Sequence, residues 1–560
     1  MIRAPRALCG VLLLVGVFAV GRAAVSPDTA LSADEQAARF LVQATFGPTS
    51  DSIAELRQMG YNYSAWIDAQ AGKPQTKAMD ILAAARAAGS ITTSDRNHNR
   101  RARTQVMLTG QDQLRQRIAY ALSQIVVVSD ADTNIANASD GSSAWWDMLA
   151  RNALGNFKTL LTDVTRSPMM GRYLSHYKNR KANTASGTRP DENYAREVMQ
   201  LFSIGLYQLN SNGTYITDST GRPLETYTND NITEFARVFT GFTDESTNNT
   251  GTGTGRTDFP TATADYISPM RMWEAQHDTA AKTLLAYAGA RKPNLPANQP
   301  GLTDVSDALD NLIEHPSCAP FISRLLIQRL VSANPSDGYV ARVASTFANN
   351  GSGVRGDLLA VVKAILLDSE ARSLSMLTDA EHGKLQEPFL RLTQLLRAGK
   401  FTISAGTTVI PYDLGAFSES SMGQFPLGAP SVFNFYSPDY EPPGVIQNAR
   451  LVGPEFQILN AVTAIAFPNA VYTLIYSGTG NMRLDLSAQE TLAATPGSLI
   501  DNLDLLLTRG TLSADNRTKI LTAVNGITAG MVPSGSTLNR ERARLAYYLI
   551  ALSPEFAVLK

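Results

Sequence analysis

Apolar residues recur along most of this chain at the three- and four-residue spacing of an amphipathic α-helix. A helix with this spacing has one apolar face, which it buries against other elements. The pattern predicts helices over residues 35–42, 51–59, 76–88, 113–128, 143–152, 156–165, 193–205, 231–242, 305–315, 320–331, 338–348, 354–367, 385–398 and 540–552. Alternating strand patterns are confined to residues 214–217 and 402–411, so the predicted fold class is mainly α with few short strands.

Three long segments between the predicted helices are polar and rich in turn-forming residues. Residues 210–228 and 244–269 are rich in Thr, Gly, Asn and Asp, and residues 402–444 contain several prolines. Loops of this length in a helical protein are typically lids, binding surfaces or spacers. We therefore expect one large multi-helix domain over residues 24–560, with these three segments as long polar loop insertions.

The first 23 residues have a different pattern, which predicts a secretory signal peptide. Arg3 and Arg6 precede an apolar run, and the small residues Gly21 and Ala23 stand just before Ala24. The apolar run of about ten residues is shorter than the roughly 20 that a membrane-spanning helix needs. We expect cleavage near Ala24, export to the periplasm or the extracellular space, and no membrane span in the mature chain.

The charge balance excludes one broad class of partner. The 560 residues contain 49 Lys and Arg against 50 Asp and Glu, a net charge of -1. This balance provides no long-range field to attract nucleic acid, so no nucleic-acid partner is expected. The chain also lacks a Gly-x-Ser-x-Gly motif, a His-Glu-x-x-His motif and a Gly-rich phosphate-binding loop. The standard hydrolase, metalloprotease and nucleotide-binding classes therefore lose support.

Several short motifs follow one another in a characteristic order. They are Arg-Phe-Leu-Val-Gln-Ala-Thr-Phe-Gly at 39–47, Leu-Arg-Gln-Arg-Ile-Ala-Tyr-Ala-Leu-Ser-Gln at 114–124, Arg-Pro-Asp-Glu-Asn-Tyr-Ala-Arg-Glu at 189–197, His-Asp at 277–278, His-Pro at 315–316 and Ser-Pro-Glu-Phe at 553–556. With this order the chain resembles the domain-of-unknown-function 1800 family of exported bacterial proteins, over nearly the whole mature length. The resemblance implies a large, mostly helical exported protein, and it implies no established reaction.

The resemblance also implies a partner protein, and it shows three positions at which this chain departs from related members. Members of this family are often encoded beside exported sulfatase-like proteins of the domain-of-unknown-function 1501 family, which makes such a protein the expected partner. Related members usually have Asn, Glu and His where this chain has Asp191, Gln200 and Phe202. A mechanism that needs all of those polar groups is weakened by this departure.

Residues 189–205 contain the strongest candidate site. Asn193 and Glu197 are four residues apart, so they lie on one face of the predicted helix, and Glu192 stands just before it. A carboxylate beside an apolar seam can act as a general acid or base, and two or three oxygen ligands can hold a divalent cation such as calcium. An ordinary i,i+4 ion pair between Glu192 and Arg196 is the structural alternative.

His277, Asp278 and Lys282 form a second candidate set. Asp278 is typical of the N-cap of a helix over residues 279–288, with Lys282 as its i,i+4 partner. His277 can titrate near neutral pH or bind a metal ion. A carboxylate and histidine site arises only if Glu197 is buried and lies close to His277. The candidate catalytic residues are Glu192, Glu197 and His277.

Trp145 is a candidate for contact with a sugar. It follows a loop rich in Asp, Ser and Gly and is adjacent to Trp146. Neighbouring residues on a helix point about 100° apart, so one ring is expected in the core and the other could stack on a sugar. The candidate ligand-binding residues are Asn193, Arg196, Asp278, Lys282 and Trp145.

Two classes of function remain open at this stage. The first is a binding or assembly factor at the cell surface or on an extracellular polymer, such as a polysaccharide, and the export signal and long polar loops favour it. The second is an extracytoplasmic hydrolase or lyase that acts on a carbohydrate or sulfated polymer through carboxylates and a histidine. An enzyme of that kind requires these groups to converge on one pocket.

Overall fold

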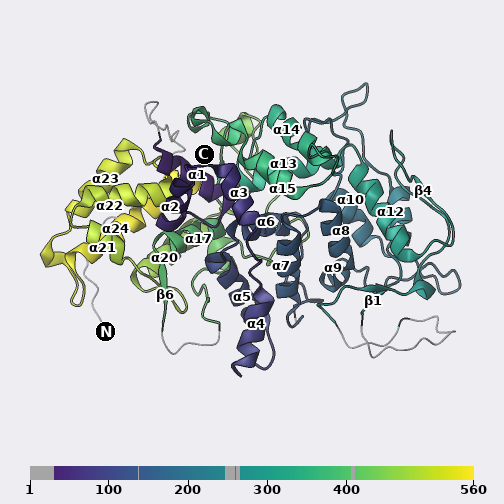
Figure 1. The fold of residues 1–560 in the computed structure, drawn as a ribbon, viewed down its shortest axis with the longest axis horizontal. Coiled ribbons are helices and arrows are strands. Elements are labelled where there is room, and N and C mark those ends of the chain that lie inside the picture. Colours follow the sequence, from purple (N-terminus) through teal and green to yellow (C-terminus); the bar gives the residue numbers. More distant parts are fainter. Residues whose placement is uncertain (1–30, 137, 246–258, 260–264, 405–409) are drawn as a thin grey trace.

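The computed structural model of the protein describes residues 31–136, 138–245, 259, 265–404 and 410–560. Within these residues the chain forms 25 α-helices, and its strands, none longer than three residues, pair in four two-stranded sheets (Figure 1). The protein is therefore mainly α, as the apolar spacing predicts. Each of the 14 segments predicted from apolar spacing contains a helix. The expected signal peptide lies outside the described residues.

Six of the helices in the N-terminal part follow a residue whose side chain accepts a backbone hydrogen bond. Ser32, for example, forms a capping box with Glu35 at the start of the first helix. The helices up to residue 245 are α1 (Ala33–Ala44), α2 (Ser50–Gln58), α3 (Tyr63–Ala71), α4 (Ala78–Ala87), α5 (Arg96–Thr109), α6 (Gln113–Ser123), α7 (Gly141–Asn152), α8 (Phe157–Arg166), α9 (Pro168–Tyr173), α10 (Asn193–Gln200) and α11 (Asn229–Val238).

The remaining helices continue to the end of the chain. They are α12 (Gly301–Glu314), α13 (Cys318–Leu330), α14 (Asp337–Ala348), α15 (Leu358–Leu366), α16 (Ser369–Arg372), α17 (Pro388–Ala398), α18 (Glu419–Met422), α19 (Val445–Asn448), α20 (Thr463–Tyr476), α21 (Ser487–Leu492), α22 (Pro496–Leu503), α23 (Ala514–Asn525), α24 (Leu538–Ala551) and α25 (Pro554–Ala557). Short 3-10 or π turns are η1 (Glu274–Gln276), η2 (Leu374–Leu377), η3 (Pro454–Ile458), η4 (Asp504–Thr508) and η5 (Ala529–Met531).

The strands form antiparallel pairs that join distant parts of the chain. The pairs are β1 (Phe242–Thr243) with β2 (Arg271–Met272), β3 (Lys282–Thr283) with β4 (Asn294–Leu295), β5 (Lys384–Leu385) with β8 (Val558–Leu559), and β6 (Phe401–Ile403) with β7 (Met482–Leu484). β6 lies at the start of the predicted strand over residues 402–411. The predicted strand over 214–217 is wrong, because those residues form only isolated bridges at Tyr215 and Thr217.

Buried apolar side chains from most of the helices form one continuous core. The core cluster includes residues of α1 at one end of the chain and of α24 and α25 at the other. Figure 1 shows α1 and α2 beside the C-terminal helices α21–α24, with α8, α10 and α12 on the opposite side of the molecule. Helix α6 lies between these parts and contacts α1, α3, α7 and α13.

Residues 402–444 are not the exposed insertion that their prolines led us to expect. Within the described part of this segment, Leu414, Phe417 and Tyr436 are buried in the protein. Tyr436 donates a hydrogen bond through its hydroxyl to Gln124 Oε1 over 2.9 Å. The segment therefore covers the core with irregular backbone. Of the insertion expected at 244–269, residues 246–258 and 260–264 lie outside the described residues.

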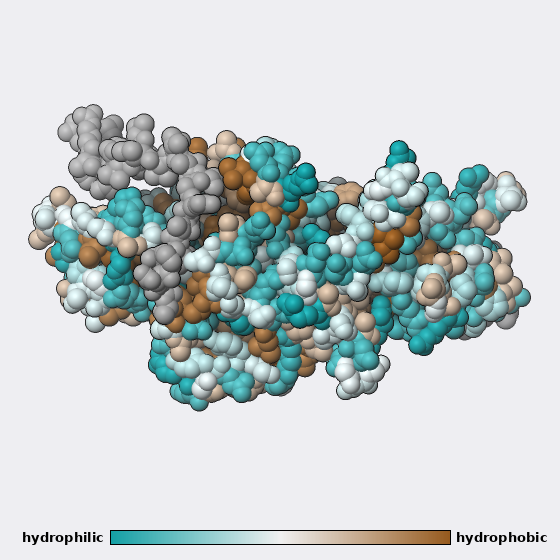
Figure 2. Space-filling view, turned by 90° about the horizontal axis from the view of Figure 1, so that it is seen from above, coloured by the Kyte–Doolittle hydropathy of each residue, from teal (hydrophilic) through white to brown (hydrophobic). Residues whose placement is uncertain are grey.

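The surface is mixed in character. In Figure 2 hydrophilic residues predominate on the face shown, and hydrophobic residues appear in separate small areas. No helix in the described part of the chain combines the length and the apolar composition that crossing a bilayer requires.

Three buried histidines make the fold sensitive to acid. Burial lowers the pKa of His176, His315 and His382 to about 4 each, and nearby cations add to this effect at His315 and His382. Their unfolded pKa is about 6.5, so between about pH 6.5 and 4 the unfolded chain binds more protons than the folded protein. Stability is then lost as the pH falls through this window. Asp147, whose pKa burial raises to about 6, opposes the change.

We predict that the free energy of unfolding falls by several kcal/mol between pH 6.5 and 4, to be measured by chemical denaturation at intervals of half a pH unit. His382→Gln removes one of the titrating groups and should make the dependence less steep. A free energy of unfolding that stays constant across this window would contradict the prediction.

Candidate functional site

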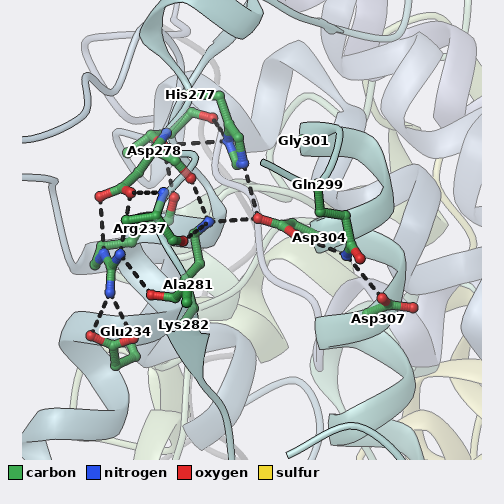
Figure 3. Close-up of polar contacts among 12 residues, drawn as sticks. Glu234, Arg237, His277, Asp278, Ala281, Lys282, Gln299, Gly301, Asp304 and Asp307 are labelled. Atoms are coloured by element: carbon green, nitrogen blue, oxygen red, sulfur yellow. Dashed lines mark hydrogen bonds and ion pairs between the residues drawn. The ribbon is translucent and has the colours of Figure 1, made fainter. Parts of the chain in front are cut away.

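His277 lies at the centre of a closed network of hydrogen bonds and ion pairs (Figure 3). It directly follows η1, and its side chain is fully buried. Nδ1 lies 2.9 Å from the main-chain oxygen of Thr240, and Nε2 lies 3.1 Å from Asp304 Oδ2. Both ring nitrogens therefore face oxygen acceptors of the protein, which leaves neither nitrogen directed at a ligand.

Asp304 accepts hydrogen bonds from three side chains. It lies in the first turn of α12, where the helix dipole favours a negative charge. Lys282 Nζ lies 2.6 Å from the same oxygen that meets His277, and Gln299 Nε2 donates to Oδ1 over 2.8 Å. Burial alone raises the pKa of Asp304, but the hydrogen bonds from His277 and Lys282 and their charges hold it below the usual value.

Lys282 and Asp278 do not form the predicted i,i+4 pair, and the predicted helix over 279–288 is wrong. The chain instead forms β3 there, and Lys282 points inward to Asp304 and to main-chain oxygens of Asp278 and Ala280. The Asp278 carboxylate receives two hydrogen bonds from Arg237. These partners lie far away in the sequence, so local spacing could not indicate them.

Arg237 completes the network on its outer side. Its guanidinium bridges Asp278 and Glu234, with Nη1 at 2.7 and 2.8 Å from the two Glu234 oxygens. Such forked contacts between a guanidinium and carboxylates are strong and geometrically specific. The network thus joins α11, β3 and α12. Its charged side chains satisfy one another's charges, and they are Glu234, Arg237, Asp278, Lys282 and Asp304.

The segment at 189–197 is only partly what the sequence predicts. Glu192 accepts from Thr233 Oγ1 over 3.0 Å and lies 3.7 Å from Arg196, with both charged side chains more than 40% exposed. That contact is the structural alternative, a solvated i,i+4 pair of small energetic weight. Asn193 is exposed.

Glu197 differs from its neighbours because it is buried and one of its oxygens has no hydrogen-bond partner in the part of the chain that the structure describes. The residue is 5% exposed, and its Oε2 has no hydrogen-bond partner among the described residues. Burial raises the pKa of Glu197, an effect that Arg196 partly offsets. Tyr173 and Tyr227 are near enough for the charge of Glu197 to add to the burial that raises the pKa of both hydroxyls, to about 12 for Tyr227.

The predicted convergence of Glu197 with His277 is not found. No hydrogen bond joins them, because both His277 nitrogens are held by Thr240 and Asp304. Trp145 is 1% exposed and Trp146 is fully buried, so neither ring offers a face to a sugar in this structure. The described residues also contain no group of three or more His, Cys, Asp or Glu side chains arranged to hold a metal ion.

The polar segment after α10 contains a feature that sequence analysis did not single out. Residues 206–226 form three extended arms that bond to one another: Gln208 donates to Leu224, Leu224 to Ile216, and Ile216 back to Gln208, through main-chain groups 2.8 to 2.9 Å apart. We call this unit the three-arm loop. Its base is fixed to the body by a hydrogen bond from the main chain of Leu209 to Ser317 Oγ.

The three-arm loop exposes apolar side chains. Tyr207 and Tyr215 are 39% and 55% exposed, and their rings meet edge to face with centroids 5.6 Å apart. Leu206 and Leu224 are exposed beside them on the same loop. The signal in the sequence was the alternation of Tyr and Ile among Thr, Asn and Gly residues, which we interpreted as a polar loop with a short strand over residues 214–217.

Fold and site together define a large, mainly helical protein with a closed ion network and an exposed aromatic loop. A model of the family described as Protein of unknown function (DUF1800) matches residues 39–558, nearly the whole chain. The chain belongs to this family. No curated protein and no solved structure matches it.

We predict that Lys282→Met lowers the free energy of unfolding by about 3 to 5 kcal/mol, because it leaves Asp304 buried without its cation. Lys519→Met is the matched control. Lys519 pairs with Asp515, and both side chains are at least 70% exposed, so the loss of this pair should cost less than about 1 kcal/mol. Chemical denaturation of both variants measures the difference. Equal effects would show that the network does not depend on buried charge.

Proposed function

We propose that the protein is an exported binding or assembly factor that contacts an extracellular polymer through the three-arm loop. The observation that carries this proposal is the exposed pair of Tyr207 and Tyr215 on a loop fixed by its own hydrogen bonds. Aromatic side chains with one polar end are suited to surfaces that are partly apolar and partly wet, such as sugar rings. Holding the rings in place in advance reduces the entropy lost on binding.

Two expectations from the sequence support the proposal. The predicted signal peptide would bring the protein to the compartment where extracellular polymers occur. The balanced charge favours a neutral polymer over nucleic acid. The family resemblance implies a sulfatase-like partner protein, which is the alternative ligand for the three-arm loop. Binding of that partner would make the protein an assembly factor.

We predict that the purified protein sediments with at least one of three insoluble polysaccharides, cellulose, chitin or peptidoglycan. The double variant Tyr207→Ser with Tyr215→Ser should weaken this binding about tenfold or more, because it removes both rings. Tyr472→Ser is the matched control, since Tyr472 is 43% exposed and also contacts a second tyrosine ring, that of Tyr476, on another part of the surface.

Failure of the parent protein to sediment with any of the three polymers would refute the polymer role, as would equal binding by the double variant. Capture of the sulfatase-like protein by the parent but not by the double variant would instead identify that protein as the occupant.

A second candidate function, a hydrolase or lyase acting on a carbohydrate or sulfated polymer, is favoured by one observation. Glu197 is a buried carboxylate with a free oxygen and a raised pKa, which are properties of a general acid. Tyr173 and Tyr227, whose hydroxyls the charge of Glu197 influences, could orient a sugar hydroxyl. Unlike the sequence-based hypothesis, this version assigns no role to His277.

For this second function we predict that Glu197→Gln abolishes the release of reducing ends from the same polymers. The free energy of unfolding should remain unchanged or rise, because the amide keeps the shape and removes a charge that burial disfavours. Reducing-sugar assays and thermal melts of the two proteins make the comparison. If the parent protein releases no reducing ends, the catalytic function is rejected and the binding function is unaffected.

A further inference from the structure

A polar pocket lies away from both the His277 network and the three-arm loop. It opens between the N-terminal end of α5, the connection that follows α6 and the start of α7, and it has a volume of about 360 Å³. This volume is near the lower limit of small-molecule sites, which span about 300 to 1,000 Å³. The lining residues are Ser94, Asp95, Arg96, Asn97, Asn99, Asp130, Ile135, Ala136, Ala138, Ser139 and Ser142.

The floor of the pocket is held rigidly. Asn99 is 1% exposed and donates to the main-chain oxygens of Asp95 and Ser139 over 2.8 and 2.6 Å, which joins the two sides of the pocket. Asp130 is 2% exposed and is bound by Arg103 and Arg100, each with a nitrogen 2.9 Å from one of its oxygens. A site with this support loses little freedom when a ligand binds.

Unused hydrogen-bonding groups line the same pocket. Ser94 and Ser142 are 7% and 5% exposed, and each hydroxyl accepts a hydrogen bond from an arginine. Neither hydroxyl donates its own proton to an acceptor among the described residues, so two buried donors remain for a ligand. At the rim the Asn97 side chain is exposed and forms no hydrogen bond with the described residues.

The charges around the pocket cancel. Arg96, Arg100 and Arg103 carry three positive charges, and Asp95, Asp130 and Glu419 carry three negative ones. Arg96 and Arg100 bond Asp130, and Arg100 also bonds Glu419 over 2.6 Å. An anionic ligand would compete with Asp130 for these guanidiniums. A neutral ligand rich in hydroxyl groups meets donors and acceptors here without displacing an ion pair.

One wall of the pocket is apolar. It consists of Ile135, Ala136 and Ala138, small or aliphatic side chains that can pack against the C–H face of a ring. We propose that this pocket binds one or two units of a neutral saccharide, with hydroxyls bonded to Ser94, Ser142 and Asn97. The site shares no residue with the three-arm loop, so it adds a second contact for the polymer of the proposed function and can be tested without it.

The test is isothermal titration of the purified protein with neutral soluble saccharides: glucose, galactose, mannose, N-acetylglucosamine and cellobiose. At least one should bind. Asn97→Ala should weaken that binding about three- to tenfold, the effect of one lost hydrogen bond. Ala136→Phe fills the pocket and should abolish binding. Asn229→Ala, an exposed asparagine in the first turn of α11, is the matched control and should bind like the parent.

Three results would overturn the proposal. One is no binding of any of these saccharides at about 10 mM. Another is binding that neither Asn97→Ala nor Ala136→Phe changes. The third is binding of sulfate or inorganic phosphate that Ala136→Phe removes, which would identify an anion site. The double variant of Tyr207 and Tyr215 should leave saccharide titration unchanged, so failure of the loop and failure of the pocket give different results.

Discussion

The need of buried charged groups for hydrogen-bonding partners is the constraint on which the rest of this structure depends. Glu387, at the start of α17, is fully buried, and one of its oxygens accepts from Tyr120, Gln124 and Gln424 over 2.6 to 2.9 Å. Two of these donors come from α6 and the residue that caps its C-terminal end, and the third comes from the irregular segment after β6. A buried carboxylate is tolerated only with such partners, so this one residue ties three distant segments to the centre of the molecule.

The same constraint explains how much of the fold the sequence could predict. Apolar spacing indicates helices wherever one face is buried, which is why each of the 14 segments predicted from it contains a helix. It missed α5, whose sequence begins Arg-Asn-His-Asn-Arg-Arg-Ala-Arg, because Arg103 is buried there as an ion partner of Asp130. The capping signal of Asp278 predicted a further helix, but ion pairs to Arg237 and Asp304 hold this part of the chain, which forms β3 instead.

The candidate site was predictable to a similar degree. Glu197 is buried, which the sequence analysis gave only as the condition for a site. The i,i+4 spacing of Glu192 and Arg196 correctly allowed an ordinary ion pair. The hydrogen-bond partners of His277 could not be predicted from local spacing, because Thr240 and Asp304 are 37 and 27 residues away in the sequence. Pockets and exposed surfaces depend on such long-range contacts, so neither the pocket at α5 nor the tyrosine pair could be located from local patterns.

The three-arm loop has a consequence for how this family can diversify. Its arms satisfy one another's backbone groups, and it connects α10 to α11 without contributing Tyr207 or Tyr215 to the core. Substitutions at these exposed positions therefore change the chemistry of the surface while the folding of the body is little affected. Under the proposed function, a lineage would acquire a new binding preference through a few changes in one short segment.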